Sequence, residues 1–137
     1  MPQENVELAK RAYAALNDAY GTGEFLPVIE EFFDPEIVFK PAGILPETGE
    51  VQGHDGLLAF TQRQAEAFDQ LSIEPEEIID AGDQVIVPLR LAGRARFTGI
   101  PIEFVLVHLA TFHDGRAVRV DVYADKAEAL KAAGLSE

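Results

Sequence analysis

The sequence predicts an α+β domain in which helices come first and an antiparallel sheet follows. Apolar residues recur every three or four positions through most of residues 3–69, as they do in amphipathic helices. From Leu71 onward the pattern changes to that of strands. The pair Asp114–Gly115 separates two apolar runs, which is a strong hairpin signal. A sheet of this kind, strongly curved, folds around the helices and leaves a cone-shaped hollow.

The composition limits the classes of protein to which this chain can belong. From its length we expect one domain over residues 1–137. Hydrophobic residues make up 47% and charged residues 26%, as in a soluble globular protein. The lack of cysteine excludes disulfides, thiol nucleophiles and thiolate metal sites. The net charge of −13 opposes binding to nucleic acid or to an anionic membrane surface. The sequence shows neither a signal-peptide pattern nor an apolar run of membrane-spanning length, so we expect a cytoplasmic protein.

Three helices are expected in the first half of the chain. Residues 3–20 and 24–33 carry apolar side chains at helical spacing. A third helix should begin at an N-cap aspartate and cover residues 55–69. Between the last two helices, residues 36–41 look like a short strand. The Pro- and Gly-rich loop Ala42–Gly53 follows, and its length is typical of a functional or mobile loop.

The second half is expected to form the sheet. Residues 71–80 are interrupted by Pro75, which favours an edge strand. A strand over residues 84–97 follows, and then a hairpin over Ile102–Tyr123. A capping box starting at Asp125 predicts a closing helix that ends near residue 134.

The hairpin carries the most informative histidine, His108. Strand alternation places it on one face with Phe104 and Leu106, while Val105, Val107 and Leu109 occupy the other face. Since both faces are apolar, we expect this strand to be covered on both sides. His108 is then either a core histidine with a local partner or the polar group at the bottom of a pocket.

Two registers of the hairpin are open. A two-residue turn would place Asp121 opposite His108 and build a His–Asp pair. A three-residue turn with a bulge would place Val120 there and build an apolar wall around the histidine. The valines at positions 118, 120 and 122 favour the second register.

Several segments together resemble a known family, the SnoaL-like branch of the nuclear-transport-factor-2-like superfamily of ketosteroid isomerase-like and polyketide cyclase-like proteins. The segments are NVELAKRAYAALN, FFDPEIVF, VQGHDGLLAF, EEIIDAGDQVIV and TFHDGRAVRVDVYADKAEALKAAGL. The resemblance covers nearly the whole chain. It implies a cone-shaped fold with a curved mixed or antiparallel sheet around the N-terminal helices and a short C-terminal helix. It also implies the bulged turn, with His108 pointing inward, and a homodimer through the outer sheet face.

The family's catalytic patterns transfer only in part. The ketosteroid-isomerase tyrosine would fall on Ala12, next to Tyr13, and its oxyanion-hole acid on His108. Its general-base aspartate would fall on Lys40, and a lysine can take that role only if burial strongly lowers its pKa.

Two related activities are matched still less completely. The acid–base aspartate of the cyclising relatives would fall on Val122, with Asp121 beside it. The epoxide-hydrolase relatives use an Asp–Arg–Asp set, and for it this sequence offers only Arg90 and Asp121 as possible matches. A constellation of catalytic side chains therefore has to be sought in the fold itself.

We expect His108 to transfer a proton, with Tyr13 or Lys40 stabilising an oxyanion. Each residue also has a purely structural interpretation. His108 would be a core histidine with a hydrogen-bond partner, Tyr13 would pack within its helix, and Lys40 would extend to the rim of the pocket. Histidines 54, 108 and 113 show no metal-ligand spacing, so we expect no metal and no cofactor.

The predicted function is binding of a small apolar metabolite, with isomerase-, cyclase- or epoxide-hydrolase-type chemistry as the catalytic version. The ligand should lie against an apolar wall formed by Phe60, Phe104, Leu106, Val120 and Val122. The alternatives are a non-catalytic dimeric binding module and a protein-interaction module that uses the outer sheet face.

Overall fold

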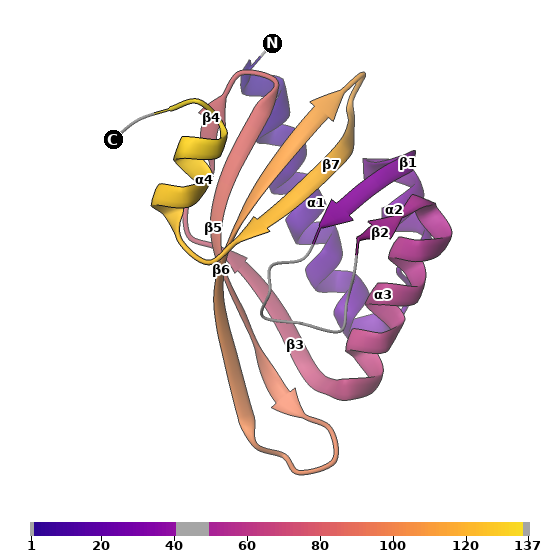
Figure 1. Cartoon of the computed structure of the whole chain (residues 1–137). Coiled ribbons are helices and arrows are strands. Elements are labelled where there is room, and N and C mark those ends of the chain that lie inside the picture. The colour runs from indigo at the N-terminus through magenta and orange to yellow at the C-terminus, as the bar shows by residue number, and fades with distance from the viewer. Residues whose placement is uncertain (1, 41–49, 136–137) are drawn as a thin grey trace.

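The structure is a computed structural model that describes residues 2–40 and 50–135. Its helices are α1 (Pro2–Thr22), α2 (Leu26–Phe32), α3 (Gly53–Ala67) and α4 (Lys126–Ala132). Figure 1 shows α1, α2 and α3 gathered on one side of the curved sheet and α4 on the other. No helix within these ranges is both long and apolar enough to cross a membrane.

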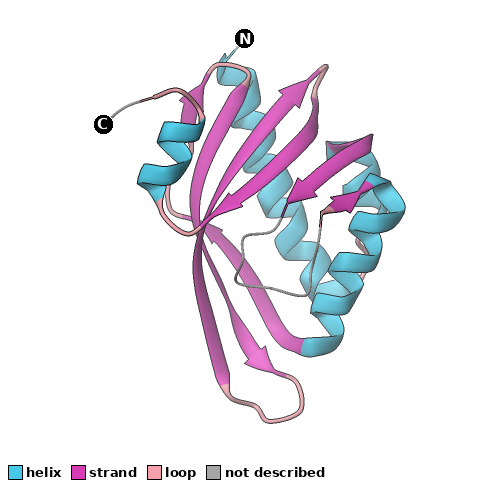
Figure 2. Ribbon diagram, viewed as in Figure 1, coloured by secondary structure: helices cyan, strands magenta, loops and turns pink. Residues whose placement is uncertain are grey.

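Seven strands form one mixed sheet, which Figure 2 shows curving around the long first helix. The strands are β1 (Phe33–Lys40), β2 (Val51–Gln52), β3 (Phe68–Pro75), β4 (Ile79–Ala81), β5 (Gln84–Ala95), β6 (Pro101–His113) and β7 (Arg116–Tyr123). Their order is β2-β1-β7-β6-β5-β3, and β4 pairs with β5. Among the strand pairs of the described residues, only β1 and β7 are parallel. The predicted α+β fold is confirmed.

Two expectations about the strands need correction. Residues 71–80 form two strands rather than one, because β3 ends at Pro75 and the backbone N–H of Glu76 turns to donate to the carbonyl of Pro88. The stretch expected as a loop, residues 42–53, contains the short strand β2 and the start of α3. The sequence leaves open whether this stretch is a mobile lid, and most of its residues lie outside the described ranges.

The β6–β7 hairpin adopts neither predicted register. Its turn has two residues, with Asp114 at φ 51° and Gly115 at φ 80°, as a tight hairpin turn requires. His113 and Arg116 pair as a two-residue turn predicts, but Thr111 pairs with Arg119 and Phe112 with Ala117.

The extra residue between these pairs, Val118, is a β-bulge. Because the bulge shifts every later pair by one, His108 faces Val122 rather than Asp121 or Val120. The bulge returns Val120 and Val122 to the concave side. The predicted apolar wall forms, but from a different turn and with a different partner for His108.

The convex face of the sheet is less open than expected. Val107 and Leu109 are buried beneath Ala129 and Leu130 of α4, together with Ile86. The capping box that starts this helix is confirmed, since the Asp125 side chain accepts a hydrogen bond of 2.8 Å from the backbone N–H of Glu128. Of the apolar residues predicted on this face, Val105 stays exposed, at 56%.

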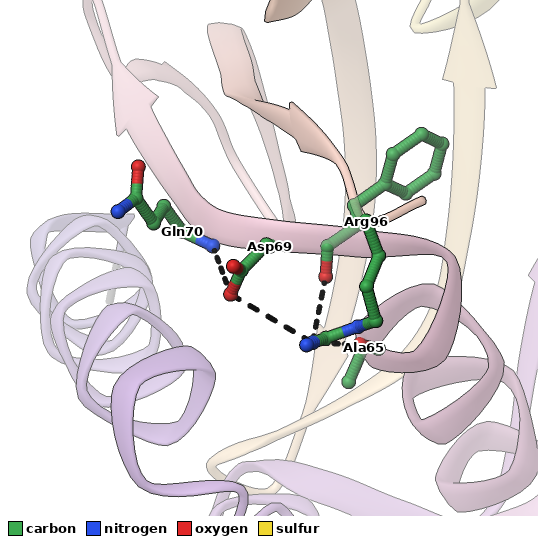
Figure 3. A network of polar contacts seen from close by, with 5 residues as sticks. Ala65, Asp69, Gln70 and Arg96 are labelled. Atoms are coloured by element: carbon green, nitrogen blue, oxygen red, sulfur yellow. Dashed lines mark hydrogen bonds and ion pairs between the residues drawn. The ribbon is translucent and has the colours of Figure 1, made fainter. Parts of the chain in front are cut away.

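An arginine ties the long β5–β6 hairpin to the end of α3. The Arg96 guanidinium donates to the carbonyls of Ala65 (2.7 Å) and Phe68 (3.2 Å) and lies 3.8 Å from a carboxylate oxygen of Asp69 (Figure 3). These contacts satisfy carbonyls at the end of the helix that have no partner within it. A positive charge at a helix C-terminus is also favourable. The contacts hold together the elements that form one side of the cavity described below.

Arg96→Ala should lower the free energy of unfolding by about 1 kcal/mol, because it removes charge-assisted hydrogen bonds at a half-exposed site. Urea unfolding of the two proteins measures the difference. Arg116→Ala, which removes the same charge from the exposed hairpin turn, is the control and should change stability little. Equal losses in the two variants would show that the contacts of Arg96 contribute nothing of their own.

Candidate functional site

A cavity of about 370 Å³ lies between the concave face of the sheet and helices α1, α2 and α3. That volume falls in the range of small-molecule pockets. The described lining is almost entirely alanine, valine, leucine, isoleucine and phenylalanine. The other side chains that line it are Tyr13, Tyr20, Thr61, Arg63, Gln64 and His108.

All five residues predicted to contact a ligand lie in this lining. They come from three elements: Phe60 from α3, Phe104 and Leu106 from β6, and Val120 and Val122 from β7. Their convergence follows from the curvature of the sheet, which turns the inward side chains of β6 and β7 toward α3. The apolar wall is therefore present, and ligand binding stays a prediction.

The structure brings Tyr13 and His108 together in this cavity. The tyrosine hydroxyl oxygen lies 2.8 Å from Nδ1 of the imidazole, and the ring centroids are 5.9 Å apart. Tyr13 reaches the ring from α1, and the register of β6 points His108 toward it. Phe39 of β1 packs edge-on against the same imidazole at 6.2 Å. Two of the three predicted catalytic residues thus form one hydrogen-bonded pair.

The position of Tyr13 is set by an anchor one helical turn further along α1. The amide side chain of Asn17 donates to the carbonyl of Ile73 and accepts from its backbone N–H at 2.7 Å. Ile73 lies in β3, an edge strand whose outward backbone groups would otherwise lack partners. The Asn17 side chain therefore makes the hydrogen bonds to Ile73 that a neighbouring strand would make, and it fixes the position of α1 relative to the sheet.

Both members of the pair are neutral at pH 7. Burial raises the pKa of Tyr13, and the neighbouring Tyr20 adds to this effect. Burial lowers the pKa of His108 from 6.5 to about 4. The cause in each case is that the apolar surroundings disfavour the charged form. A neutral imidazole carries one N–H, so either the tyrosine O–H donates to Nδ1 or the Nδ1–H donates to the tyrosine oxygen.

The third predicted catalytic residue, Lys40, is not brought to this pair. It is exposed at the end of β1 and does not belong to the described lining, whereas its neighbour Phe39 does. Because side chains alternate along a strand, an inward Phe39 directs Lys40 to the opposite face. The expected inward orientation of the lysine is therefore corrected.

Asp121 also lies away from the cavity. It accepts hydrogen bonds of 2.9 and 3.1 Å from the guanidinium of Arg119 and pairs with Leu109 on the convex face. Arg90 approaches Glu76 (3.6 Å) and Glu103 (3.5 Å) rather than Asp121. Within the described residues, the carboxylate sets of the cyclising and epoxide-hydrolase relatives are therefore not assembled in the cavity.

Sequence reasoning missed the polar residues that α3 contributes. Gln64 accepts a 3.2 Å hydrogen bond from the hydroxyl of Tyr20, whose pKa burial raises to about 12. Arg63 lies beside Gln64 in the lining. Their spacing from Phe60, three and four residues, could have indicated that they share its helix face.

Within residues 2–40 and 50–135, no cluster of three or more histidine, aspartate or glutamate side chains could hold a metal ion. His54 contacts the carbonyl oxygen of Phe33 at 2.8 Å, at the junction where α3 begins. His113 lies 3.2 Å from Asp114 in the exposed turn.

Solved structures show the same fold. An NTF2-like protein from Burkholderia xenovorans LB400 is 26% identical, with 97% of each chain covered and a TM-score of 0.71. A protein from Jannaschia sp. CCS1, provisionally described as a SnoaL-like polyketide cyclase, is 23% identical, with 90% of this chain and 87% of that chain covered and a TM-score of 0.73. TerC, crystallised with polyporic acid, is 20% identical, with 96% and 98% covered and a TM-score of 0.74.

Comparison with curated proteins gave no match. Comparison with protein families gave one, the SnoaL-like domain, which matches residues 9–120. That range covers α2, α3 and β1 to β6 in full and most of α1 and β7, and with them nearly all of the cavity lining, but not α4. The chain therefore belongs to the SnoaL-like domain family and has the NTF2-like fold.

Proposed function

We propose that the protein binds a small, largely apolar molecule in this cavity and acts on one of its oxygen atoms by cofactor-free acid–base chemistry. The observation that carries the proposal is the neutral Tyr13–His108 pair in a largely apolar lining. The fold alone would not support it, because one fold hosts many functions. A neutral donor and acceptor at one point of an apolar cavity can orient a ligand and move a proton without creating a buried charge.

The pair suits a reaction in which negative charge develops on a carbonyl oxygen. When the O–H of Tyr13 donates to Nδ1, the proton of the imidazole lies on Nε2, which can donate to the ligand. A neutral imidazole can polarise a carbonyl in this way, and it acts most strongly where water is excluded. Isomerisation or cyclisation through an enol fits the other tautomer, in which Nδ1–H donates to the tyrosine oxygen. Nε2 can then take the α-proton of the ligand while the Tyr13 O–H protonates its carbonyl oxygen and Nδ1–H returns a proton to the tyrosine, so that the pair is neutral before and after the step. A SnoaL-like polyketide cyclase assignment for the Jannaschia relative is consistent with it.

The test is a thermal-shift screen with polyporic acid, steroids, phenols and polyketide-like aromatics, followed by chromatography of each mixture. A ligand at a hundred times its Kd should stabilise the fold by about 2.7 kcal/mol. His108→Asn and Tyr13→Phe should each weaken binding about tenfold, the effect of losing one hydrogen bond in an apolar site. His113→Asn, in the exposed turn, is the matched control.

The outcomes separate the candidate functions. Conversion of a ligand that stops in both variants supports catalysis. Binding without conversion favours the non-catalytic binding module. If no compound stabilises the protein, the proposal is wrong and the outer sheet face becomes the next site to study.

The homodimer expected through that face also stays a prediction. Exposed Val105 supports it, whereas the burial of Val107 and Leu109 by α4 reduces the apolar area available. Light scattering after size-exclusion chromatography measures the mass directly. A monomer at all concentrations used would contradict the prediction.

A further inference from the structure

Arg63 is the one charged side chain in the described lining of the cavity. It extends from α3, on the same helix face as Phe60, Gln64 and Ala67. Of the residues in that lining, only Arg63 and Ala67 are exposed. Their exposure indicates that the cavity reaches the surface along the last two turns of α3, where Arg63 lies.

Arg63 differs from the other arginines in its place, because it lines the cavity, whereas Arg11, Arg94 and Arg116, which also form no ion pair among the described residues, do not. Aspartate and glutamate outnumber lysine and arginine by 24 to 11, yet the described lining contains no carboxylate. Arg90, Arg96 and Arg119 each approach a carboxylate, at 3.5, 3.8 and 2.9 Å.

Arg63 forms no ion pair with any carboxylate in residues 2–40 and 50–135, including Glu66 three positions further along α3. Its planar guanidinium has five N–H donors, which match the geometry of a carboxylate. Within the described part of the chain no carboxylate engages these donors, so they are available to a ligand of the cavity that Arg63 lines.

Two aromatic side chains, Phe60 and Phe39, connect the part of α3 that carries Arg63 with the Tyr13–His108 pair. The rings of Phe60 and Phe39 are 5.1 Å apart, and the Phe39 ring is 6.2 Å from the imidazole of His108. Arg63 follows Phe60 by three residues, a rise of about 4.5 Å along the helix. The cation and the neutral pair therefore lie at two ends of a wall that suits a flat apolar body.

We propose that the cavity selects amphipathic ligands with a carboxylate-like anionic group, which Arg63 binds at the opening while the apolar body extends toward Tyr13 and His108. This inference rests on the proposed function and adds the class of ligand to it. Gln64 supports the same site. Since its amide oxygen accepts from Tyr20, its NH₂ group can donate to the anion beside Arg63.

The test compares two probes of nearly the same size and shape, 2-naphthoate, which is an anion, and 2-naphthamide, which is neutral. Their affinities are measured by isothermal titration at pH 7 and low salt. The wild-type protein should prefer the carboxylate. Arg63→Gln should weaken naphthoate binding about tenfold and leave naphthamide within twofold, while Arg63→Lys should fall between, because it keeps the charge without the planar fork. Arg116→Gln removes the same charge from the exposed hairpin turn and should change neither affinity.

Four results would overturn the proposal. Equal wild-type affinity for the two probes, or loss of both in Arg63→Gln, removes the role of charge but leaves the apolar cavity and the proposed function intact. Equal weakening of naphthoate by Arg116→Gln shows a general effect of net charge. If neither probe binds the wild-type protein, the proposed function fails together with this inference.

Discussion

Lowering the pH from 7 toward 4 should cost the folded protein about 3 kcal/mol of unfolding free energy through His108 alone. In the folded state the pKa of this histidine is about 4, because burial disfavours the imidazolium, whereas its ordinary value is 6.5. Between these two values the unfolded chain binds a proton that the folded chain does not. The stability contribution is therefore fully present above pH 6.5 and is lost as the pH falls toward 4.

Urea unfolding at several pH values between 4.5 and 7.5 measures this effect. Carboxylates also titrate in acid, so the informative quantity is the difference between the wild type and His108→Asn. That difference should change with pH, since asparagine does not titrate. His113→Asn removes the exposed turn histidine and should keep the wild-type slope. Parallel pH profiles for the wild type and His108→Asn would mean that the imidazole is not desolvated in the folded protein.

Gly93→Ala should destabilise the fold by about 2 to 3 kcal/mol, because the new methyl group has no space. A Cβ at this position would lie 2.9 Å from the carbonyl oxygen of Asp69, 3.0 Å from Cδ2 of Leu71 and 3.3 Å from its Cα. Two of these atoms belong to the backbone of β3, so relief requires β3 and β5 to separate. Asp69 and Leu71 flank the irregular part of β3, where Gln70 has φ 56°.

Gly21→Ala is the matched control for this substitution. Gly21 lies near the end of α1, and an added Cβ would meet nothing within 4 Å. Alanine there should be neutral or stabilising by up to about 1 kcal/mol, because it favours the helix and restricts the unfolded chain. Urea unfolding measures both variants. If Gly93→Ala is as stable as Gly21→Ala, the close approach of the two strands does not constrain the sheet.

Local sequence patterns were sufficient for most of the fold. The spacing of apolar residues predicted α1 and α3, and the capping box at Asp125 predicted α4, because these signals depend only on residues within a few positions of each other. The alternation in β6 likewise predicted which side chains share the face of His108. Phe104 and Leu106 follow from this alternation, Val120 and Val122 from the alternation of β7 and Phe60 from helical spacing, and all five lie in the lining.

Patterns that involve only residues a few positions apart could not predict the register of the hairpin. The Asp114–Gly115 turn is visible in the sequence, but the bulge at Val118 is not, since a valine carries no local signal for it. That single residue decides that Val122 faces His108 and that Asp121 lies on the convex face. The outward direction of Lys40 depends in the same way on the pairing of β1 with β7.

What the sequence determined by itself is the α+β class, the order of the helices and long strands, and the apolar character of the cavity. What only the tertiary structure decided is the site. Tyr13 and His108 are 95 residues apart in the sequence. Their hydrogen bond forms because α1 crosses the concave face of the sheet next to the part of β6 that carries His108. The position of Arg63 at the opening depends equally on how α3 packs over the sheet. Periodicity determines the face of an element to which a side chain belongs, whereas the curvature and register of the sheet determine which faces meet.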